Sequence, residues 1–153
     1  MRALIQRVSG AKVQIKDKTI SSINDGLLIF IGIYSNDTID DINKLYHKVM
    51  NLRIFEDNNK SSIIDIRGEV LIVSQFTLCA NTKKGNRPSF KDAMSPKLAK
   101  VMFDDLVDIF KASQLKIKTG KFGASMDVSL KNKGPMTIFL DTKIWKQKIQ
   151  LEL

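Results

Sequence analysis

Two unbroken apolar runs place the strongest limit on how this chain can fold. They are GLLIFIGI at residues 26–33 and EVLIVSQF at residues 69–76, and the second becomes polar at its end. A strand with one face in water alternates apolar and polar residues, so an uninterrupted run of this length is typical of a strand buried on both faces. The sequence therefore predicts a central sheet with other elements packed against it.

Further strand-forming segments lie on both sides of these runs. They are ALIQRV and AKVQI within residues 2–15, LKIKTG at 115–120, MDVSL at 126–130 and MTIFLD at 136–141. The last eleven residues, KIWKQKIQLEL, fit a short helix and a strand equally well. Strands and helices do not alternate strictly along the chain, which disfavours a doubly wound nucleotide-binding fold.

Two segments show helical spacing of apolar residues. The first begins at Asp37 with acids in its first turn, and its apolar face is Ile39, Ile42, Leu45, Tyr46, Val49 and Met50. The second begins with Ser95 as N-cap and Pro96 as the first helical residue. Its predicted buried stripe is Leu98, Val101, Met102, Leu106, Ile109 and Phe110.

The expected fold is one α/β domain with a mainly antiparallel or mixed sheet covered by two helices. A chain of 153 residues is long enough for one such core, and no linker or repeat divides it. No apolar run approaches the ~18 residues that span a bilayer, and MRALIQRVSG lacks the order of a signal peptide. Together with a single cysteine, Cys79, this predicts a cytoplasmic protein without disulfides.

The charge favours a polyanionic partner, and the residue types limit the chemistry. Twenty-five Lys and Arg against 16 Asp and Glu give a net charge of +9, although a solvated basic surface would give the same count. With only His47 and Cys79 available, a multi-His or Cys/His zinc site is excluded, and His47 falls on the polar side of the first helix.

Nucleotide chemistry is disfavoured too, because the glycines do not form G-x-G-x-x-G or G-x-x-x-x-G-K-[ST]. A reaction would have to use backbone donors, hydroxyls, amides or groups of the substrate itself. Hydrolysis of an activated ester can proceed in this way.

Two segments combine strand ends with polar and basic residues. They are SQFTLCANTKKGNRPSF at residues 74–90 and NKGPMTIFLDT at residues 132–142. Taken singly, polar residues at a strand end satisfy backbone groups, and a Gly-Pro pair makes a turn.

Together with MRALIQRV and TGKFGASM, these segments resemble the D-aminoacyl-tRNA deacylase family, in the same order and spacing. The resemblance covers residues 1–142 and leaves residues 143–153 as a tail without an assigned role. It implies a homodimer that acts on aminoacyl-tRNA, hydrolysing D-aminoacyl-tRNA to free D-amino acid and tRNA without metal or other cofactor. It implies no membrane association.

The resemblance also assigns roles to individual residues. Gly134 and Pro135 match the family's Gly-cis-Pro pair, which enters the partner's site across the dimer interface and rejects L-amino acids through main-chain atoms. Arg7 matches the arginine that holds this loop, although its position alone indicates a surface residue at a strand end. Ser74, Gln75, Phe76 and Thr77 match the catalytic motif, with the N–H groups of Phe76 and Thr77 facing the oxyanion.

Two further groups are implied in binding. Phe122, Ala124 and Met126 match the part that receives the terminal adenosine, although Met126 shares a strand face with Val128 and Leu130 and fits a core position equally. The basic residues expected at tRNA phosphates, or on a solvated loop, are Lys83, Lys84, Arg87 and Lys91.

Two other functions stay open. A basic RNA-binding module without catalysis would account for the charge, but no ribonucleoprotein aromatic signature is present. The second is a family member that acts on another aminoacyl ester, such as a mischarged glycyl-tRNA.

Overall fold

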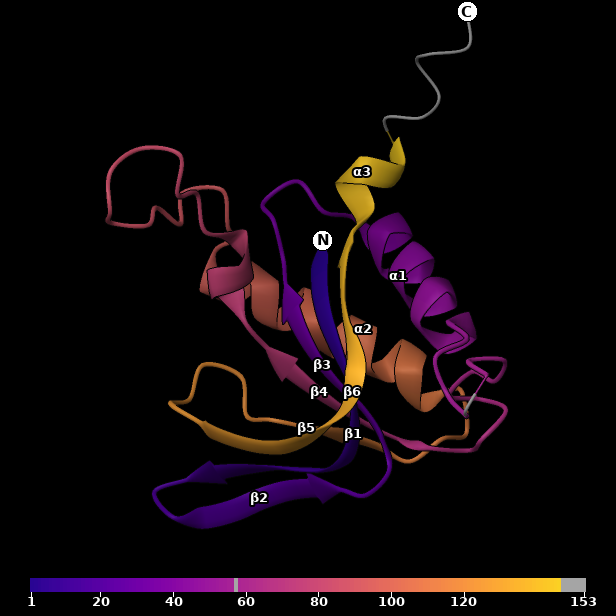
Figure 1. The fold of residues 1–153 in the computed structure, drawn as a ribbon. Coiled ribbons are helices and arrows are strands. Elements are labelled where there is room, and N and C mark those ends of the chain that lie inside the picture. Colours follow the sequence, from indigo (N-terminus) through magenta and orange to yellow (C-terminus); the bar gives the residue numbers. More distant parts are fainter. Residues whose placement is uncertain (57, 147–153) are drawn as a thin grey trace, which may run out of the picture.

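A six-stranded mixed sheet forms the centre of the computed structural model, which describes residues 1–56 and 58–146 (Figure 1). The strands are β1 (Arg2–Ile15), β2 (Lys18–Ile23), β3 (Gly26–Gly32), β4 (Glu69–Ser74), β5 (Ile117–Thr119) and β6 (Asp127–Asp141). The helices are α1 (Ile39–Asn51), the 3₁₀-helix η1 (Phe76–Cys79), α2 (Pro96–Lys111) and α3 (Thr142–Lys146).

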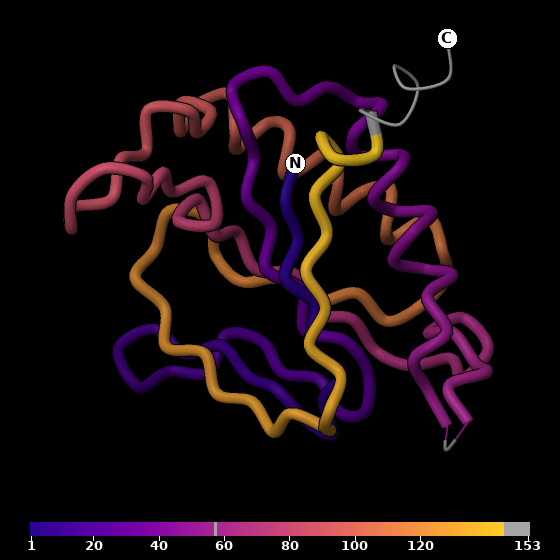
Figure 2. The backbone as a smooth tube through the Cα atoms, turned by 45° about the horizontal axis from the view of Figure 1, so that its top comes forward, coloured from indigo at the N-terminus to yellow at the C-terminus, as the bar shows by residue number. Residues whose placement is uncertain are grey.

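The strand order is β2-β1-β3-β4-β5, and β6 also pairs with β1. The β3–β4 and β4–β5 pairs are parallel, whereas β1 is antiparallel to β2, β3 and β6. On β2, Ser21 Oγ donates to the Thr119 carbonyl of β5 at 2.8 Å. This bond joins the two ends of the strand path, so the sheet curls nearly into a barrel (Figure 2).

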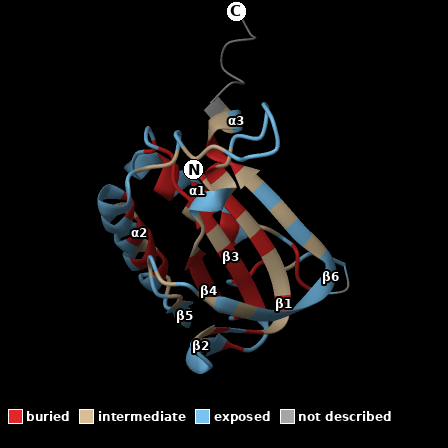
Figure 3. Ribbon diagram, turned by 90° about the vertical axis from the view of Figure 1, so that its left-hand side faces the viewer, coloured by how far each residue is buried: buried red, intermediate tan, exposed pale blue. Residues whose placement is uncertain are grey.

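The two apolar runs form β3 and β4 at the middle of the sheet, as predicted, and both strands are buried for most of their length (Figure 3). One face carries the main core, which α1 and α2 cover. The helix residues in this core are Ile42, Leu45, Val49, Met50, Phe103, Leu106, Val107 and Phe110. A smaller core on the other face includes Val8, Val13, Leu28, Leu71 and Val73.

The start of α2 agrees with the sequence, whereas α1 begins at Ile39, two residues later than predicted. Thr38 is the N-cap of α1, in a capping box with Asp41, and Ser95 and Pro96 open α2. The predicted apolar faces are wrong in part, because Ile39, Leu98 and Val101 are 50%, 60% and 58% exposed. The sheet instead receives the α2 stripe of Ala99, Phe103, Leu106, Val107 and Phe110.

The C-terminal part of the sheet differs from the sequence prediction. MDVSL and MTIFLD are not two strands separated by a Gly-Pro turn but parts of the single strand β6. The register between β1 and β6 shifts where Gln6 pairs with Thr137 and Val8 pairs with Asn132. Gly134 and Pro135 therefore lie in a bulge opposite Arg7.

The C-terminal tail, for which the sequence left a helix and a strand open, is described only up to residue 146. Residues 142–146 form α3, so a short helix describes the beginning of the tail, whereas residues 147–153 lie outside the described residues. Within residues 1–56 and 58–146, none of the helices has the length and apolar character needed to cross a membrane.

Candidate functional site

A cavity of about 660 Å³ brings together two of the predicted groups, which are distant in sequence. Ser74, Gln75 and Phe76 line it from the end of β4 and the start of η1. Phe122, Ala124 and Met126 line it from the segment that precedes β6. The wall between them comes from the approach to α2 and its first turn, with Phe90, Ala93, Met94, Ser95, Pro96 and Ala99.

The turn from β4 into η1 fixes the polar edge of this cavity. The backbone N–H of Gln75 donates to the Ile31 carbonyl of β3 at 2.7 Å, so the strand pairing continues for one residue beyond β4. The chain then closes a tight turn in which the Leu78 amide donates to the Gln75 carbonyl at 3.2 Å. The first N–H groups of such a helix have no acceptor in the helix itself, and here they belong to Phe76 and Thr77.

Thr77 lies beside the cavity rather than in its wall. Its side chain is exposed, and Gln75 Nε2 donates to Thr77 Oγ1 at 2.5 Å. Phe76 is 59% exposed, and its ring packs against the Phe90 ring with centroids 5.1 Å apart. Residues 74–77 thus place the Phe76 ring and the hydrogen-bonded side chains of Gln75 and Thr77 beside the cavity.

Cys79, the last residue of η1, is not a candidate nucleophile despite its position. Its side chain is buried. Burial raises the pKa of the Cys79 thiol to about 11, and the nearby Asp37 carboxylate adds to this. The reactive form of cysteine is the thiolate, so the residue is unreactive near neutral pH.

Met126 lies where the cavity meets the smaller core. It lines the cavity, and it also packs with Val128 against the smaller core. Its sulfur accepts the Lys121 amide at 3.3 Å. Leu130 is 37% exposed and does not extend this buried face.

The Gly-Pro loop lies elsewhere on the same chain. Gly134 and Pro135 are exposed, are joined by a cis peptide bond, and line a different cavity of about 510 Å³. The Arg7 guanidinium donates to the carbonyls of Lys133 at 3.1 Å and Gly134 at 2.9 Å. It also donates to the Ile54 carbonyl, so it ties the loop to the segment after α1.

Comparison with known proteins places this arrangement in a family. A sequence model described as D-Tyr-tRNA(Tyr) deacylase matches residues 4–141. The chain belongs to this family. A protein of Aquifex aeolicus (strain VF5) named D-aminoacyl-tRNA deacylase is 52% identical over 146 residues, covering 94% of this chain and 99% of that protein. One of the same name from Thermosipho africanus (strain TCF52B) is 48% identical, covering 94% and 98%.

The fold of this deacylase-family chain is also similar to a solved structure. The structure of the c-Myc DNA Unwinding Element Binding Protein has a TM-score of 0.86 and 38% sequence identity, covering 92% of this chain and 98% of that chain. The fold described above is therefore shared with that structure.

Three of the predicted basic residues, Lys83, Lys84 and Arg87, occupy one loop, and Lys91 follows its base between the cavity residues Phe90 and Ala93. Lys83, Lys84, Arg87 and Lys91 are all exposed. Paired backbone hydrogen bonds between Asn81 and Ser89, at 2.8 Å and 3.0 Å, close the base of the loop. The loop projects away from the sheet (Figure 1), immediately before the cavity residues Phe90 and Ala93.

Arg2 supports the site, although no local sequence pattern singled it out. Its Nη1 donates to the Leu78 carbonyl of η1 at 2.7 Å, and its Nε donates to Asp141 at 2.9 Å. The guanidinium also lies over the rings of Tyr34 and Phe139. Its place in the family-like opening MRALIQRV was the one available signal, since its partners come from distant parts of the chain.

Proposed function

We propose that this chain hydrolyses the ester bond of D-aminoacyl-tRNA to release free D-amino acid and tRNA. The observation that carries the proposal is the cavity that Ser74, Gln75 and Phe76 of the SQ-F-T motif (residues 74–77) share with Phe122, Ala124 and Met126, in a chain of the deacylase family. The cavity is mostly apolar with one polar edge, as a site for a nucleoside carrying an aminoacyl ester requires. The terminal adenosine packs against Phe122, Ala124 and Met126, and the ester lies at η1.

The chemistry rests on main-chain donors. The N–H groups of Phe76 and Thr77 stabilise the negative charge that develops on the carbonyl oxygen of the ester as water attacks the carbonyl carbon. The one histidine lies exposed on α1, and the SQ-F-T motif contains no lysine, so Thr77 has no base to activate it. In this proposal the 2′-hydroxyl of the terminal ribose assists the water, and Thr77 positions the ester.

The complete site needs a second copy of the chain. Gly134 and Pro135 line a cavity that shares no lining residue with the one at η1. On β6, Phe139 is 50% exposed and Leu130 is 37% exposed, so the strand offers apolar surface to a partner. An isologous two-fold dimer would carry each Gly-Pro loop into the other subunit's cavity and complete two equivalent sites.

Chirality would then be selected by exclusion. An L-amino acid directs its side chain where a D-amino acid has only hydrogen, and a rigid main-chain wall formed by the partner's Gly-Pro loop rejects it. Glycyl-tRNA, which has no side chain, is not rejected and is a further proposed substrate.

The experiment is hydrolysis of matched D-, L- and glycyl-tRNA esters, followed as release of free amino acid. The D-ester is expected to be cleaved and the L-ester to survive. If the folded protein binds tRNA but leaves all three esters intact, the rival function, an RNA-binding module without catalysis, is correct.

Replacing Thr77 by Ala is expected to reduce turnover of the D-ester by only about 5-fold, because a single positioning hydrogen bond contributes ~1 kcal/mol. Single-turnover kinetics with D-aminoacyl-tRNA give the comparison. Complete loss of turnover, together with an acyl group trapped on Thr77 of the parent protein in mass spectrometry, would show that Thr77 is a nucleophile.

Removing the four cations of the basic loop is expected to weaken tRNA binding and to flatten its salt dependence. For a single strand, the slope of log K against log salt falls by about 0.7 for every phosphate that the protein no longer neutralises. Titrations at several salt concentrations compare the parent with the Lys83→Ala, Lys84→Ala, Arg87→Ala, Lys91→Ala variant. A control removes Lys12, Lys16 and Lys18, which are exposed on the β1–β2 hairpin. Equal slopes for parent and loop variant would exclude this loop from the interface.

A further inference from the structure

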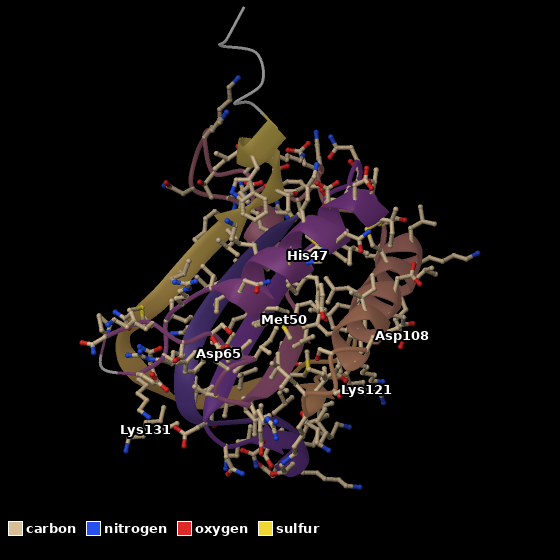
Figure 4. All side chains as sticks on the ribbon, turned by 90° about the vertical axis from the view of Figure 1, so that its right-hand side faces the viewer. His47, Met50, Asp65, Asp108, Lys121 and Lys131 are labelled. Atoms are coloured by element: carbon tan, nitrogen blue, oxygen red, sulfur yellow. The ribbon has the colours of Figure 1, made fainter. Side chains whose placement is uncertain are left out.

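A second groove, of about 660 Å³, follows the outer side of α1, the helix on which Figure 4 labels His47. Lys44, His47, Lys48 and Asn51 line it at intervals of three and four residues, which places them on one face of the helix. Arg53 extends this face beyond the helix, and Trp145 of α3 forms the opposite wall. The proposed deacylase chemistry uses none of these residues.

The groove is basic, because its lining holds Lys44, Lys48 and Arg53 against one carboxylate, Asp40; Arg53 also lies close enough to the Asp65 carboxylate to attract it. In the described part of the chain, Lys44, Lys48 and Arg53 form no ion pair, although Asp40 lies at one end of the groove. The Lys48 ammonium lies 5.7 Å from the centroid of the Trp145 ring. Trp145 is half-buried against the main core, and its remaining surface lines the groove. Cations beside an aromatic side chain are typical of surfaces that bind nucleic acid strands.

The outer side of α2 does not carry the same excess of positive charge as that of α1. The outer side of α2 carries Asp104, Asp105 and Asp108 among its lysines, and Lys100 pairs with Asp104 at 2.5 Å. A polyanion would therefore be attracted to α1 and not to α2.

The groove ends close to the Gly-Pro loop. Arg53 precedes Ile54, whose carbonyl accepts a hydrogen bond from Arg7, and Arg7 also holds the Gly134 carbonyl. In the two-chain site proposed above, the loop that enters the partner's cavity is therefore tied, through Arg7 and Ile54, to the end of the groove on its own subunit.

We propose that the α1 groove binds the sugar-phosphate backbone of the tRNA whose 3′ end occupies the partner's cavity, with Trp145 stacking on an unpaired base. Each tRNA then contacts both subunits. From Lys44 to Asn51 the helix rises by about 10 Å, enough to follow several phosphates of one strand, and Arg53 lies beyond its end. The proposal rests on the two-chain site proposed above.

The test removes the three cations as Lys44→Gln, Lys48→Gln, Arg53→Gln and compares a matched control, Lys97→Gln, Lys100→Gln, Lys111→Gln, on α2. The probe is uncharged tRNA, and the signal is the fluorescence of Trp145, the one tryptophan in the chain. In the parent, tRNA is expected to quench this fluorescence. The dissociation constant should rise at least ~10-fold in the groove variant, because about three phosphates are no longer neutralised, and less than ~2-fold in the control.

A second arm separates the groove from the catalytic site. With D-aminoacyl-tRNA, the groove variant should show a higher KM and an unchanged kcat, whereas D-aminoacyl-adenosine, which has no backbone to reach the groove, should be hydrolysed equally by all three proteins. Unchanged tRNA affinity in the groove variant, or unchanged Trp145 fluorescence at saturating tRNA, would overturn the inference. Weaker tRNA binding by the groove variant, in a protein whose parent cleaves none of the esters, would refute the proposed hydrolysis and still support the groove.

Discussion

Gly134→Ala is expected to leave the chain as stable as the parent while lowering hydrolysis of the D-ester by ~100-fold, as misplacement of a substrate by about 1 Å does. A Cβ built on Gly134 meets no atom within 4 Å in its own chain, so the substitution creates no clash there. Gly134 is also not among the glycines with positive φ, which are Gly85 and Gly123. The lower activity must then come from crowding of the partner's cavity, where glycine allows the closest approach.

Thermal unfolding and single-turnover hydrolysis of D-aminoacyl-tRNA measure the two effects separately. Gly10→Ala is the matched control, because a Cβ there makes an ordinary contact at 3.7 Å with the Ile23 carbonyl. The control should keep both stability and activity. Parent-like hydrolysis by the Gly134→Ala protein would contradict the role proposed for the loop.

The second large effect is expected for Arg7→Lys, which should reduce hydrolysis of the D-ester by at least ~10-fold although it keeps the charge. The Arg7 guanidinium reaches the carbonyls of Lys133, Gly134 and Ile54 at once. A lysine ammonium cannot reproduce this planar fork, so the Gly-Pro loop loses its fixed orientation.

The same kinetics, with D- and L-esters in parallel, check the Arg7 prediction. If the loop loosens, the ratio of D- to L-ester hydrolysis should fall, which a simple loss of stability would not produce. Arg67→Lys is the control, because Arg67 is exposed and lines neither cavity. An unaltered D-to-L ratio in Arg7→Lys would mean that the arginine has no part in selection.

The sequence predicted those elements whose signal is local. An unbroken apolar run needs burial on both faces, so β3 and β4 were placed correctly, and Ser95-Pro96 marked the start of α2. Periodicity did not fix which side of α2 faces the sheet, because apolar residues occur on several sides of that helix. Leu98 and Val101 are thus exposed, while Ala99 and Phe103 are buried.

The candidate site depended on tertiary interactions that no local pattern encodes. Composition and spacing gave no reason for Gln75 and Phe122 to share a cavity, and only the family resemblance linked them. The Gly-Pro pair has the usual signature of a turn, yet it forms a bulge because β1 continues past it with Arg7 opposite. The bond from Arg2 to the Leu78 carbonyl depends on the tertiary fold and could not be inferred.

Mixing two inactive variants tests the two-chain site most directly. Ala124→Phe is designed to fill the cavity at η1, and it keeps the Gly-Pro loop of the same chain intact. Gly134→Ala alters the Gly-Pro loop and keeps the cavity of its own chain intact. After the two proteins are mixed in equal amounts and allowed to exchange subunits, half of the dimers are mixed, and each mixed dimer has one complete site. D-aminoacyl-tRNA hydrolysis should therefore return to about one quarter of the parent rate. A mixture that forms mixed dimers but stays as inactive as its components would contradict a site built from two chains.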